Sequence, residues 1–291
     1  GGWITYVIPC GCDISNIYFS SPNNGYAVGT NGQVWFWNGT VWGNISPGIS
    51  NSFYAVNYWG GYLWAVGYGG VIYQYQPGIG WINIVSGTVY NLYSISFGCT
   101  CVGGGYGGTG YGGAGIGVGA NGTIVISNDG GTTWNNSYSG TTYDLTGAYV
   151  IDSLHMICVG QNGIVLTTSD CGVTWVPWSI GNTEDLTSVT ANGCIAYITG
   201  NSGGVYTFPI DFNAAPPEFT VSNDTVCAGS YATLSIVNPK VGSAYIWSNG
   251  SAGSTLVTNV AGTYTVTEYS LCDTLVSASQ TIYQSTPVAT I

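Results

Sequence analysis

The chain has 291 residues, of which only 4% are charged, and its formal net charge is −11 because one lysine faces twelve acids. Ordinary soluble domains carry about 25% charged residues. The acidic excess excludes nucleic acids and anionic membrane surfaces as partners, because both are negatively charged. The chain is not disorder-like, since 45% of it is hydrophobic and 14% aromatic. A surface so poor in charge is weakly protected against self-association, which predicts glycan coverage or burial in an assembly.

The cellular setting can be predicted from a few further features. No run of 18 apolar residues exists, so no membrane insertion is expected. The first residues, GGWITYV, lack a methionine, and we interpret the sequence as a processed, mature form. Nine cysteines in so polar a chain predict an oxidising, extracytoplasmic environment. We therefore expect a secreted protein.

A repeat runs through the first 210 residues. The glycine that follows its second predicted strand recurs five times, in steps of 38, 52, 41 and 40 residues, as Gly29, Gly67, Gly119, Gly160 and Gly200. Each repeat begins at what we call a start position: Asp13, Ser52, Asn91, Asp144 and Asp185. A tryptophan ends four of the repeats: Trp42, Trp81, Trp134 and Trp175. Four short strands per repeat, separated by Gly, Asn and Asp turns, are typical of a β-propeller blade.

The fifth repeat lacks a closing tryptophan, and the other end of the chain supplies a substitute. The segment GGWITYVIP resembles GIGWINIVSG of the second repeat, and Trp3 stands 39 residues before Trp42. A propeller ring closed in this way leaves only short, protected strand edges. We therefore predict an all-β, five-bladed propeller over residues 1–211, closed by its N-terminal strand.

Two of the repeats contain a shared turn motif, [ST]-x-D-x-G-x-T-W. Its residues are Ser127, Asp129, Gly131, Thr133 and Trp134 in one repeat, and Thr168, Asp170, Gly172, Thr174 and Trp175 in the next. The motif resembles that of the Asp-box propellers, including the photosystem II assembly-factor-like repeats, and the resemblance covers about residues 3–210. It implies a fold more firmly than a function. We interpret the aspartate as a cap on a tight turn, the glycine as the residue with positive φ, and the tryptophan as packing under the blade.

Asp boxes are best known from sialidases, but the composition argues against that activity. The sialidases that this repeat resembles hold a substrate carboxylate with several arginines, which bind it in a bidentate manner. This chain has no arginine, and its one lysine is Lys240 in the second domain. Hydrolase triads would have to use His155, the only histidine, which we interpret as structural. Asp144, Asp185 and Glu184 could form a glycosidase pair, but each belongs to a repeat position or a turn, so we expect no enzyme.

Two further patterns bear on cofactors. The start positions Asp13, Asn91, Asp144 and Asp185 would surround one mouth of the ring, where oxygen ligands suit Ca²⁺, unless each only caps its own turn. The glycine-rich stretch 101–119 contains Gly105-x-Gly107-x-x-Gly110, but it does not open a helix after a strand, as a dinucleotide site requires. It predicts a loop whose Tyr106 and Tyr111 pack on a neighbouring surface. No cofactor is predicted, and Ca²⁺ is the one option left open.

A second domain follows a break in composition. The stretch FNAAPPEF, residues 212–219, predicts a linker because paired prolines end a strand. Residues 220–284 alternate between apolar and polar with period two, which predicts a small β-sandwich. The phrases YIWSNG and AGTYTVT resemble the Ig-like modules of secreted Bacteroidota surface proteins. Residues 285–291 form a tail that could add a strand to a neighbouring subunit.

The cysteines suggest several bridges. Cys227 and Cys272 stand near the two ends of the second domain, and a bridge closing about 45 residues would stabilise it by about 3–4 kcal/mol; two free buried thiols are the alternative. Cys171 and Cys194 share one face of the predicted propeller and could pair. The close pairs Cys10/Cys12 and Cys99/Cys101 favour local bridges over a zinc site, and Cys158 aligns with small core residues as a buried thiol.

Two kinds of glycan acceptor occur. The N-x-[ST] acceptors are Asn38, Asn44, Asn121, Asn135, Asn223 and Asn249. If the source is a Bacteroidota bacterium, a Ser or Thr after Asp and before an apolar residue is an O-glycan candidate: Ser153, Thr225 and Thr274. Unmodified turn residues are the alternative for the O-glycan candidates, and a chain so rich in Asn, Ser and Thr produces many N-x-[ST] matches by chance.

Two functions fit these features. The first is a secreted, non-enzymatic structural protein whose copies self-assemble at the cell surface as an extracellular filament. The second is a cell-surface adhesin whose propeller binds glycans or other surface proteins through exposed aromatic residues: Trp35, Trp37, Tyr58, Trp59, Trp64 and Tyr68. The competing interpretation of these aromatics is packing between blades.

Overall fold

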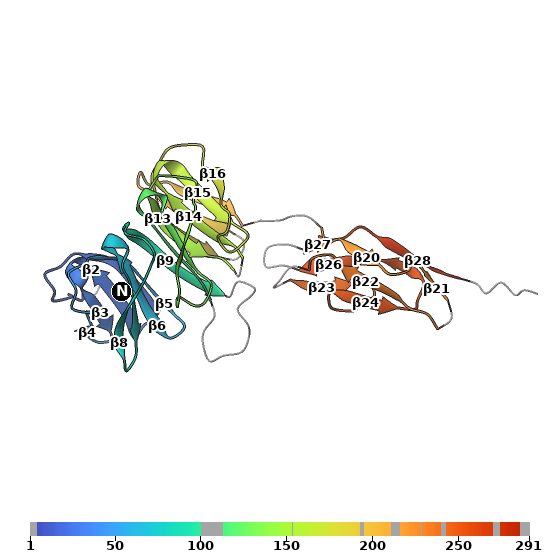
Figure 1. The fold of residues 1–291 in the computed structure, drawn as a ribbon, viewed down its shortest axis with the longest axis horizontal. Helices are drawn as coiled ribbons and strands as arrows, with labels where there is room; N and C mark the ends of the chain where they lie inside the picture. The colour runs from blue at the N-terminus through green and yellow to red at the C-terminus, as the bar shows by residue number, and fades with distance from the viewer. Residues whose placement is uncertain are drawn as a thin grey trace, which may run out of the picture. The chain divides into compact units, whose positions relative to one another are not determined.

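The computed structural model describes residues 5–99, 113–152, 154–192, 195–210, 216–227, 229–239, 243–269 and 274–285, except the side chains of Cys99 and Thr274. The chain divides into two compact units between Phe208 and Pro209 (Figure 1). Strands form nearly all of the regular structure, beside four one-turn 3-10 helices, so the predicted all-β class is confirmed. Within these ranges, no helix is long and apolar enough to cross a membrane.

The first unit consists of five antiparallel sheets in which strands adjacent in sequence are neighbours in space. The first four sheets have four strands each, and the fifth has three within the described ranges. In chain order they are β1 (Ile14–Ser21), β2 (Asn24–Gly29), β3 (Val34–Trp37) and β4 (Trp42–Asn44); β5 (Phe53–Trp59), β6 (Tyr62–Gly67), β7 (Ile72–Gln76) and β8 (Gly80–Ile84); β9 (Leu92–Cys99), β10 (Gly113–Gly119), β11 (Ile124–Ser127) and β12 (Asn135–Ser137); β13 (Leu145–Val150), β14 (Met156–Gly160), β15 (Ile164–Thr168) and β16 (Val176–Ser179); β17 (Leu186–Asn192), β18 (Ile195–Gly200) and β19 (Val205–Pro209).

A one-turn helix joins the second and third strands of each four-stranded sheet. These turns are η1 (Thr30–Gly32), η2 (Tyr68–Gly70), η3 (Ala120–Gly122) and η4 (Gln161–Gly163). The middle residue of each turn has a left-handed backbone: φ is 58° at Asn31, 71° at Gly69, 56° at Asn121 and 56° at Asn162. Asn and Gly are the residues that adopt this conformation most readily, which explains their recurrence here.

The repeated glycine of the sequence is required by close packing of backbone against backbone. A Cβ added at Gly119 would lie 1.8 Å from the Asn91 carbonyl oxygen, and one added at Gly160 would lie 2.1 Å from that of Asp144. The N–H group that follows each glycine donates to the same oxygen, from Ala120 to Asn91 and from Gln161 to Asp144, both at 2.9 Å. No side chain fits between these two segments.

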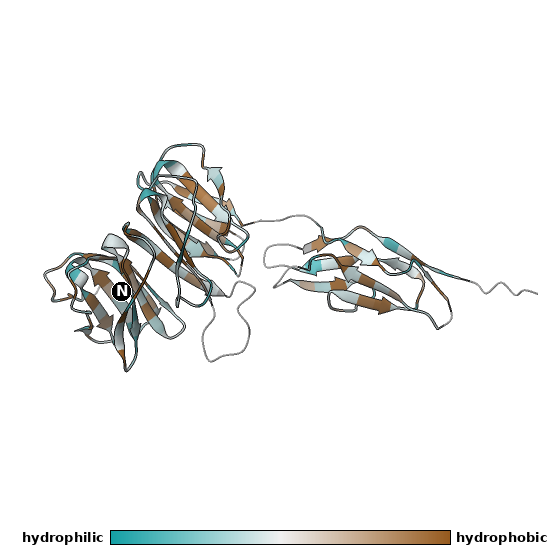
Figure 2. Cartoon of the chain, viewed as in Figure 1, coloured by the Kyte–Doolittle hydropathy of each residue, from teal (hydrophilic) through white to brown (hydrophobic). Residues whose placement is uncertain are grey.

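The core of the first unit lies between adjacent sheets. Apolar residues concentrate on the middle strands, drawn in brown in Figure 2. One cluster joins Ile116 and Val118 of β10 to Leu145 of β13 and Met156 of β14. Cys158 is fully buried in this cluster as a free thiol, as predicted, and burial raises its pKa.

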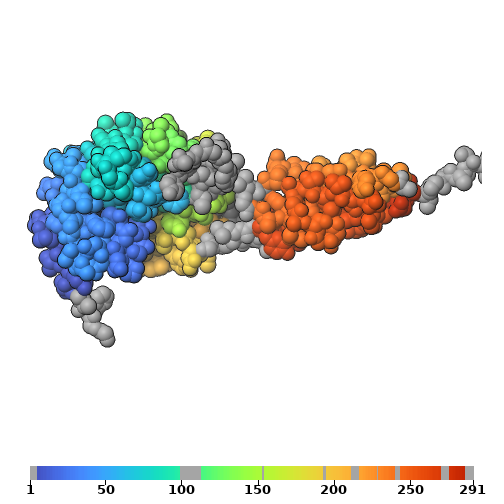
Figure 3. Space-filling view, turned by 90° about the horizontal axis from the view of Figure 1, so that it is seen from below, coloured from blue at the N-terminus to red at the C-terminus, as the bar shows by residue number. Residues whose placement is uncertain are grey.

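The two end sheets differ from the sheets between them. Ile14, Ile17 and Phe19 on β1 are 40%, 54% and 46% exposed, and Tyr197 on β18 and Val205 on β19 are 40% and 70% exposed. Residues 5–13 contain no strand, and Trp3 lies outside the described ranges. The sheets follow one another through the first unit in the space-filling view (Figure 3). A fourth strand in the last sheet is not seen in the described part of the chain.

The second unit has three three-stranded sheets around one core. They are β20 (Phe219–Val221), β22 (Ala232–Ile236) and β24 (Thr255–Thr258); β21 (Thr225–Val226), β28 (Gln280–Gln284) and β25 (Gly262–Tyr264); and β23 (Ala244–Trp247), β26 (Val266–Tyr269) and β27 (Thr274–Val276). Trp247 is buried at the centre, and its indole N–H donates to the Gly253 carbonyl at 2.9 Å. Tyr264 is also buried, and its hydroxyl donates to the Val260 carbonyl at 2.9 Å.

Candidate functional site

The turn from Ser127 to Trp134 is held by its own aspartate. The carboxylate of Asp129 accepts from the Thr133 N–H at 2.9 Å, from the Thr133 hydroxyl at 2.6 Å and from the Ser127 hydroxyl at 2.9 Å. The Ser127 hydroxyl oxygen in turn accepts the Gly131 N–H at 2.7 Å. Partial burial would raise the pKa of Asp129, but these hydrogen bonds outweigh it and hold the pKa below its ordinary value. The hydrogen bonds therefore favour the ionised carboxylate.

The turn from Thr168 to Trp175 repeats the same network. Asp170 accepts from the Thr174 N–H at 2.8 Å, from the Thr174 hydroxyl at 2.5 Å and from the Thr168 hydroxyl at 2.7 Å. Here too the hydrogen bonds outweigh the effect of burial and lower the pKa of the aspartate. Gly131 and Gly172 have φ values of 90° and 82°, which confirms the prediction of positive φ at both glycines.

Each of these two turns also fastens its sheet to the preceding one. A Cβ at Gly131 would lie 2.2 Å from the Trp64 ring of the second sheet, and one at Gly172 would lie 2.8 Å from Ile126 of the third. The Trp175 indole N–H donates to the Ser137 hydroxyl at 2.9 Å. Both turns thus help to pack their sheet against the preceding one.

The start positions connect adjacent sheets in a second way. The side-chain oxygens of Asn91, Asp144 and Asp185 accept the N–H of Gly69, Asn121 and Asn162, each at 2.9 Å. Each acceptor caps the left-handed residue in the turn of the preceding sheet. Among the described residues, no group of three or more His, Cys, Asp or Glu side chains could hold a metal ion. The three side chains therefore cap turns, but each turn belongs to the preceding sheet and not to the residue's own repeat.

Glu184 has no counterpart in the other repeats. Its carboxylate accepts the Ser202 N–H at 2.5 Å, the Gly204 N–H at 3.3 Å and the Tyr206 hydroxyl. The Tyr206 hydroxyl is the main cause that lowers the pKa of Glu184. All three acids considered for glycoside hydrolysis, Asp144, Asp185 and Glu184, are therefore used to hold turns.

His155 pairs with Asp152 three residues before it. The ring Nδ1 lies 2.8 Å from both carboxylate oxygens of Asp152. The same carboxylate accepts the N–H groups of Leu154 at 2.8 Å and His155 at 2.9 Å. Burial would raise the pKa of Asp152, yet the hydrogen bonds from His155 and Leu154 lower it overall. The contacts of Asp152 are those of a capped turn.

The aromatic side chains proposed for an adhesin are mostly not on the surface. Trp35 and Trp37 are 7% exposed and Trp64 is 1% exposed, so these three are buried, and Trp64 packs between sheets against Phe97 as the competing interpretation expects. Tyr58 stacks on Tyr26 of the first sheet, with ring centroids 5.7 Å apart. The Trp64 ring likewise contacts Phe97 of the third sheet, so aromatic rings of β5 and β6 pack between neighbouring sheets. Tyr68, at 57% exposed, is the exception.

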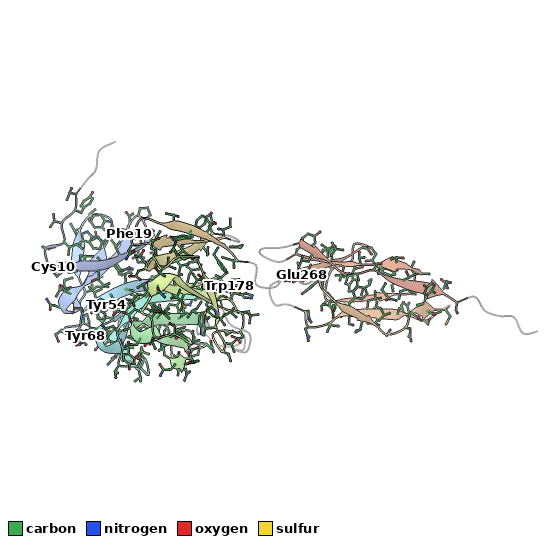
Figure 4. All side chains as sticks on the ribbon, turned by 90° about the horizontal axis from the view of Figure 1, so that it is seen from above. Cys10, Phe19, Tyr54, Tyr68, Trp178 and Glu268 are labelled. Atoms are coloured by element: carbon green, nitrogen blue, oxygen red, sulfur yellow. A yellow bond between two sulfur atoms is a disulfide. The ribbon has the colours of Figure 1, made fainter. Side chains whose placement is uncertain are left out.

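The structure adds a cluster that the sequence analysis missed. We call Tyr54, Tyr68 and Tyr93 the tyrosine cluster. The rings of Tyr54 and Tyr93 lie 5.6 Å apart, and burial, Tyr93 and Tyr68 together raise the pKa of Tyr54. Asn51 donates from its side-chain amide to the Tyr68 carbonyl at 3.3 Å. Tyr54 and Tyr68 are labelled near each other at one edge of the first unit in Figure 4.

A comparison of the repeats could have revealed this cluster. The residue one position after the first residue of the inner strand is Ser15, Tyr54, Tyr93, Thr146 and Thr187 in the five sheets. The residue after the repeated glycine is Thr30, Tyr68, Ala120, Gln161 and Asn201. Aromatic residues occupy these positions only in the second and third repeats.

The cysteines and glycan acceptors are only partly described. A disulfide joins Cys10 to Cys12, which agrees with the local bridge expected for that pair. Cys101, Cys194 and Cys272 lie outside the described residues, as do Lys240, Ser153 and the tail after residue 285. Residues 101–112 of the glycine-rich stretch, with Tyr106 and Tyr111, also lie outside them, but the rest of the stretch forms β10 (Gly113–Gly119), so the loop prediction was wrong for that part. The pairings Cys171–Cys194 and Cys227–Cys272 therefore remain predictions. All six N-x-[ST] asparagines and Thr225 are exposed, so each is accessible to a modifying enzyme.

Comparisons with known proteins bear on the fold. No protein-family model matches the chain, and no curated protein matches its sequence. Among solved structures, YCF48 from Cyanidioschyzon merolae is similar with a TM-score of 0.53 at 15% identity, covering 96% of this chain and 99% of that one. The WD40 β-propeller domain of Doa1 has a TM-score of 0.55 at 12% identity, covering 88% of this chain and 89% of that one. The β-propeller domain of Cps50 (Swd1) from Myceliophteria thermophila has a TM-score of 0.55 at 12% identity, covering 90% and 95%. These likenesses support a β-propeller fold.

Proposed function

We propose that the first unit is a five-bladed ring that closes when its end sheets meet and its N-terminal segment adds the missing strand. Its two [ST]-x-D-x-G-x-T-W turns are Asp boxes with a structural role. Support comes from the exposed positions of β1. Ile14, Ile17 and Phe19 pair with Gly29, Ala27 and Gly25. In the second sheet, Phe53, Val56 and Tyr58 occupy the same places opposite Gly67, Ala65 and Leu63, and they pack against the first sheet.

The fifth sheet carries the complementary positions. Tyr197 stands three residues before Gly200, as Tyr26 stands three before Gly29. Tyr26 is the ring on which Tyr58 stacks. Closure would therefore place Phe19 on Tyr197 and bury two apolar faces at once. It would also bring Asp13 to the turn of the fifth sheet, as Asn91, Asp144 and Asp185 reach the turns before them.

Ring closure can be tested with a pair of engineered cysteines. The double variant Phe19→Cys/Tyr197→Cys is expected to form an intrachain disulfide under mild oxidation, because closure places the two positions in contact. Non-reducing electrophoresis and peptide mass spectrometry would show a crosslinked monomer. Phe19→Cys/Tyr138→Cys is the matched control, since Tyr138 is 87% exposed and directly follows β12 of the third sheet, and it should not crosslink. Crosslinks between chains only, or none, would contradict closure within one chain.

We propose that the second unit is an Ig-like β-sandwich. A buried tryptophan at the centre of the core and a tyrosine hydroxyl bonded to a backbone carbonyl a few residues upstream are features of that fold. Trp247 and the hydrogen bond from Tyr264 to Val260 supply both. The predicted Cys227–Cys272 bridge and the linker over residues 212–219 belong to the same assignment.

As the function, we infer a secreted, non-enzymatic structural protein whose copies assemble at the cell surface. The supporting observation is a surface with large apolar side chains and almost no charge. Val85, Val89 and Val173 are 83%, 80% and 75% exposed, and few charged residues keep copies apart. Sedimentation of the full chain over a concentration series tests this inference: species heavier than the 30.3 kDa monomer are expected. A monomer at every concentration would contradict this inference. The protein should be purified with any native glycans still attached.

An adhesin is the second candidate, and one observation favours it. Tyr68 is an exposed aromatic side chain that packing between sheets does not explain. An adhesin would use such residues to bind glycans or other surface proteins, while the rest of the ring served as a rigid scaffold.

A further inference from the structure

Two members of the tyrosine cluster occupy a position of the inner strand at which the repeat does not fix the type of side chain. Tyr54 and Tyr93 each occupy an irregularity in the pairing of the inner strand, between Phe53 and Ala55 and between Leu92 and Ser94. Ser15 and Thr146 fill the same irregularity in the first and fourth sheets. An extra residue of this kind re-aims its side chain and often marks a functional site. Three of the five sheets carry a small hydroxyl residue here, so the fold does not require an aromatic ring.

The small residues show what the position does when it is structural. The Thr146 hydroxyl donates to the Leu186 carbonyl of the next inner strand at 2.5 Å. Tyr54 reaches the next sheet in the same direction, but through its ring, which contacts the Tyr93 ring. Tyr54 and Tyr93 thus form a half-buried aromatic pair beside the exposed Tyr68.

Two asparagine side chains near this aromatic pair are held by hydrogen bonds. Asn91 accepts the Gly69 N–H at 2.9 Å through its Oδ1, and Asn51 donates through its Nδ2 to Tyr68. Each asparagine carries a second amide atom that can pair with a hydroxyl group. These contacts also hold the Tyr68 turn in place, so the cluster is preorganised for a ligand.

The charge of the surroundings limits the ligand. No arginine exists in the chain, and its one lysine belongs to the second unit's sequence. An anionic sugar would therefore find no cation and would meet a protein of net charge −11. Tyrosine combines an apolar face with a polar edge, which matches a ring that has an apolar face and hydroxyl groups at its rim. We propose that Tyr54, Tyr68 and Tyr93 form a binding site for a neutral pyranose glycan; this inference rests on the second candidate function.

Titration calorimetry against soluble neutral oligosaccharides tests the site. The probes are gluco-, manno- and N-acetylglucosamine oligomers, with a sialylated oligosaccharide as the anionic comparison. Wild-type protein should bind at least one neutral series and not the anionic one. Tyr68→Ala is expected to weaken binding about tenfold, and Tyr68→Phe to retain most of it, because the ring supplies the contact. Tyr138→Ala is the matched control and should bind as wild type does.

The outcomes separate this site from the function on which it rests. No binding to any neutral oligosaccharide would overturn the proposed site and remove the glycan-binding adhesin with it. Binding that is unchanged in Tyr68→Ala and in Tyr54→Ala would overturn the site alone and leave adhesion standing. A loss of binding in Tyr68→Ala, with the circular dichroism and melting temperature of wild type, would support the site.

Discussion

Replacing Gly119 with alanine is expected to destabilise the first unit by about 3–4 kcal/mol, near the upper end of single substitutions. The added Cβ would lie 1.8 Å from the Asn91 carbonyl oxygen, and both partners are backbone atoms that cannot rotate away. Relief requires the inner strand and the turn to separate, which breaks the hydrogen bond from the Ala120 N–H to Asn91. Urea unfolding followed by tryptophan fluorescence measures the loss.

Gly43→Ala is the control for this substitution. Gly43 is also a strand glycine, but the atom nearest to its added Cβ is the Phe36 carbonyl oxygen at 3.9 Å, an ordinary contact. A change within about 0.5 kcal/mol is expected there. Equal effects of the two substitutions would show that the close approach at Gly119 is not what makes glycine necessary.

Replacing Trp64 with alanine is expected to cost about 3–5 kcal/mol, because a fully buried indole leaves a cavity that its rigid neighbours cannot fill. Trp64 packs with Phe97 at 4.9 Å and Trp134 at 6.4 Å between ring centroids, and the Gly131 turn rests on its ring. The second and third sheets would therefore lose part of their common interface.

The same unfolding measurement tests this expectation, with Trp178→Ala as the control. Trp178 is a tryptophan of the fourth sheet that is half exposed and lies against Phe208. Its removal should cost less than half as much as that of Trp64. A larger effect at Trp178 would mean that the stability of the unit does not depend chiefly on the packing between the second and third sheets.

The architecture was largely predictable because the same physical requirement recurs in each repeat. Gly119 and Gly160 recur because two backbone segments touch at both places, and Trp134 and Trp175 recur because each packs against the preceding sheet. The capping role of Asp129 could also be predicted, although its bond to the Thr133 N–H spans four residues and not the two of an Asx turn. Requirements that are repeated along the chain leave a periodic signal in the sequence.

The exposure of individual aromatic residues could not be predicted from the same signal. Trp35 and Trp37 lie on β3 beside half-buried neighbours, and a strand pattern does not say whether a face meets another sheet or water. Tyr54 and Tyr93 were missed for the opposite reason. They depart from the repeat, so their role is visible only when the five copies are compared and the space around them is known.

Electron microscopy of the native material, extracted without denaturants, tests the central claim of assembly most directly. Filaments or fibrils are expected, built from a regularly repeated particle that contains a ring-shaped unit and a smaller one. Any glycans that remain attached should not hide the regular spacing of the particles. A field of uniform, single particles of one chain each would contradict the claim that copies of this chain assemble.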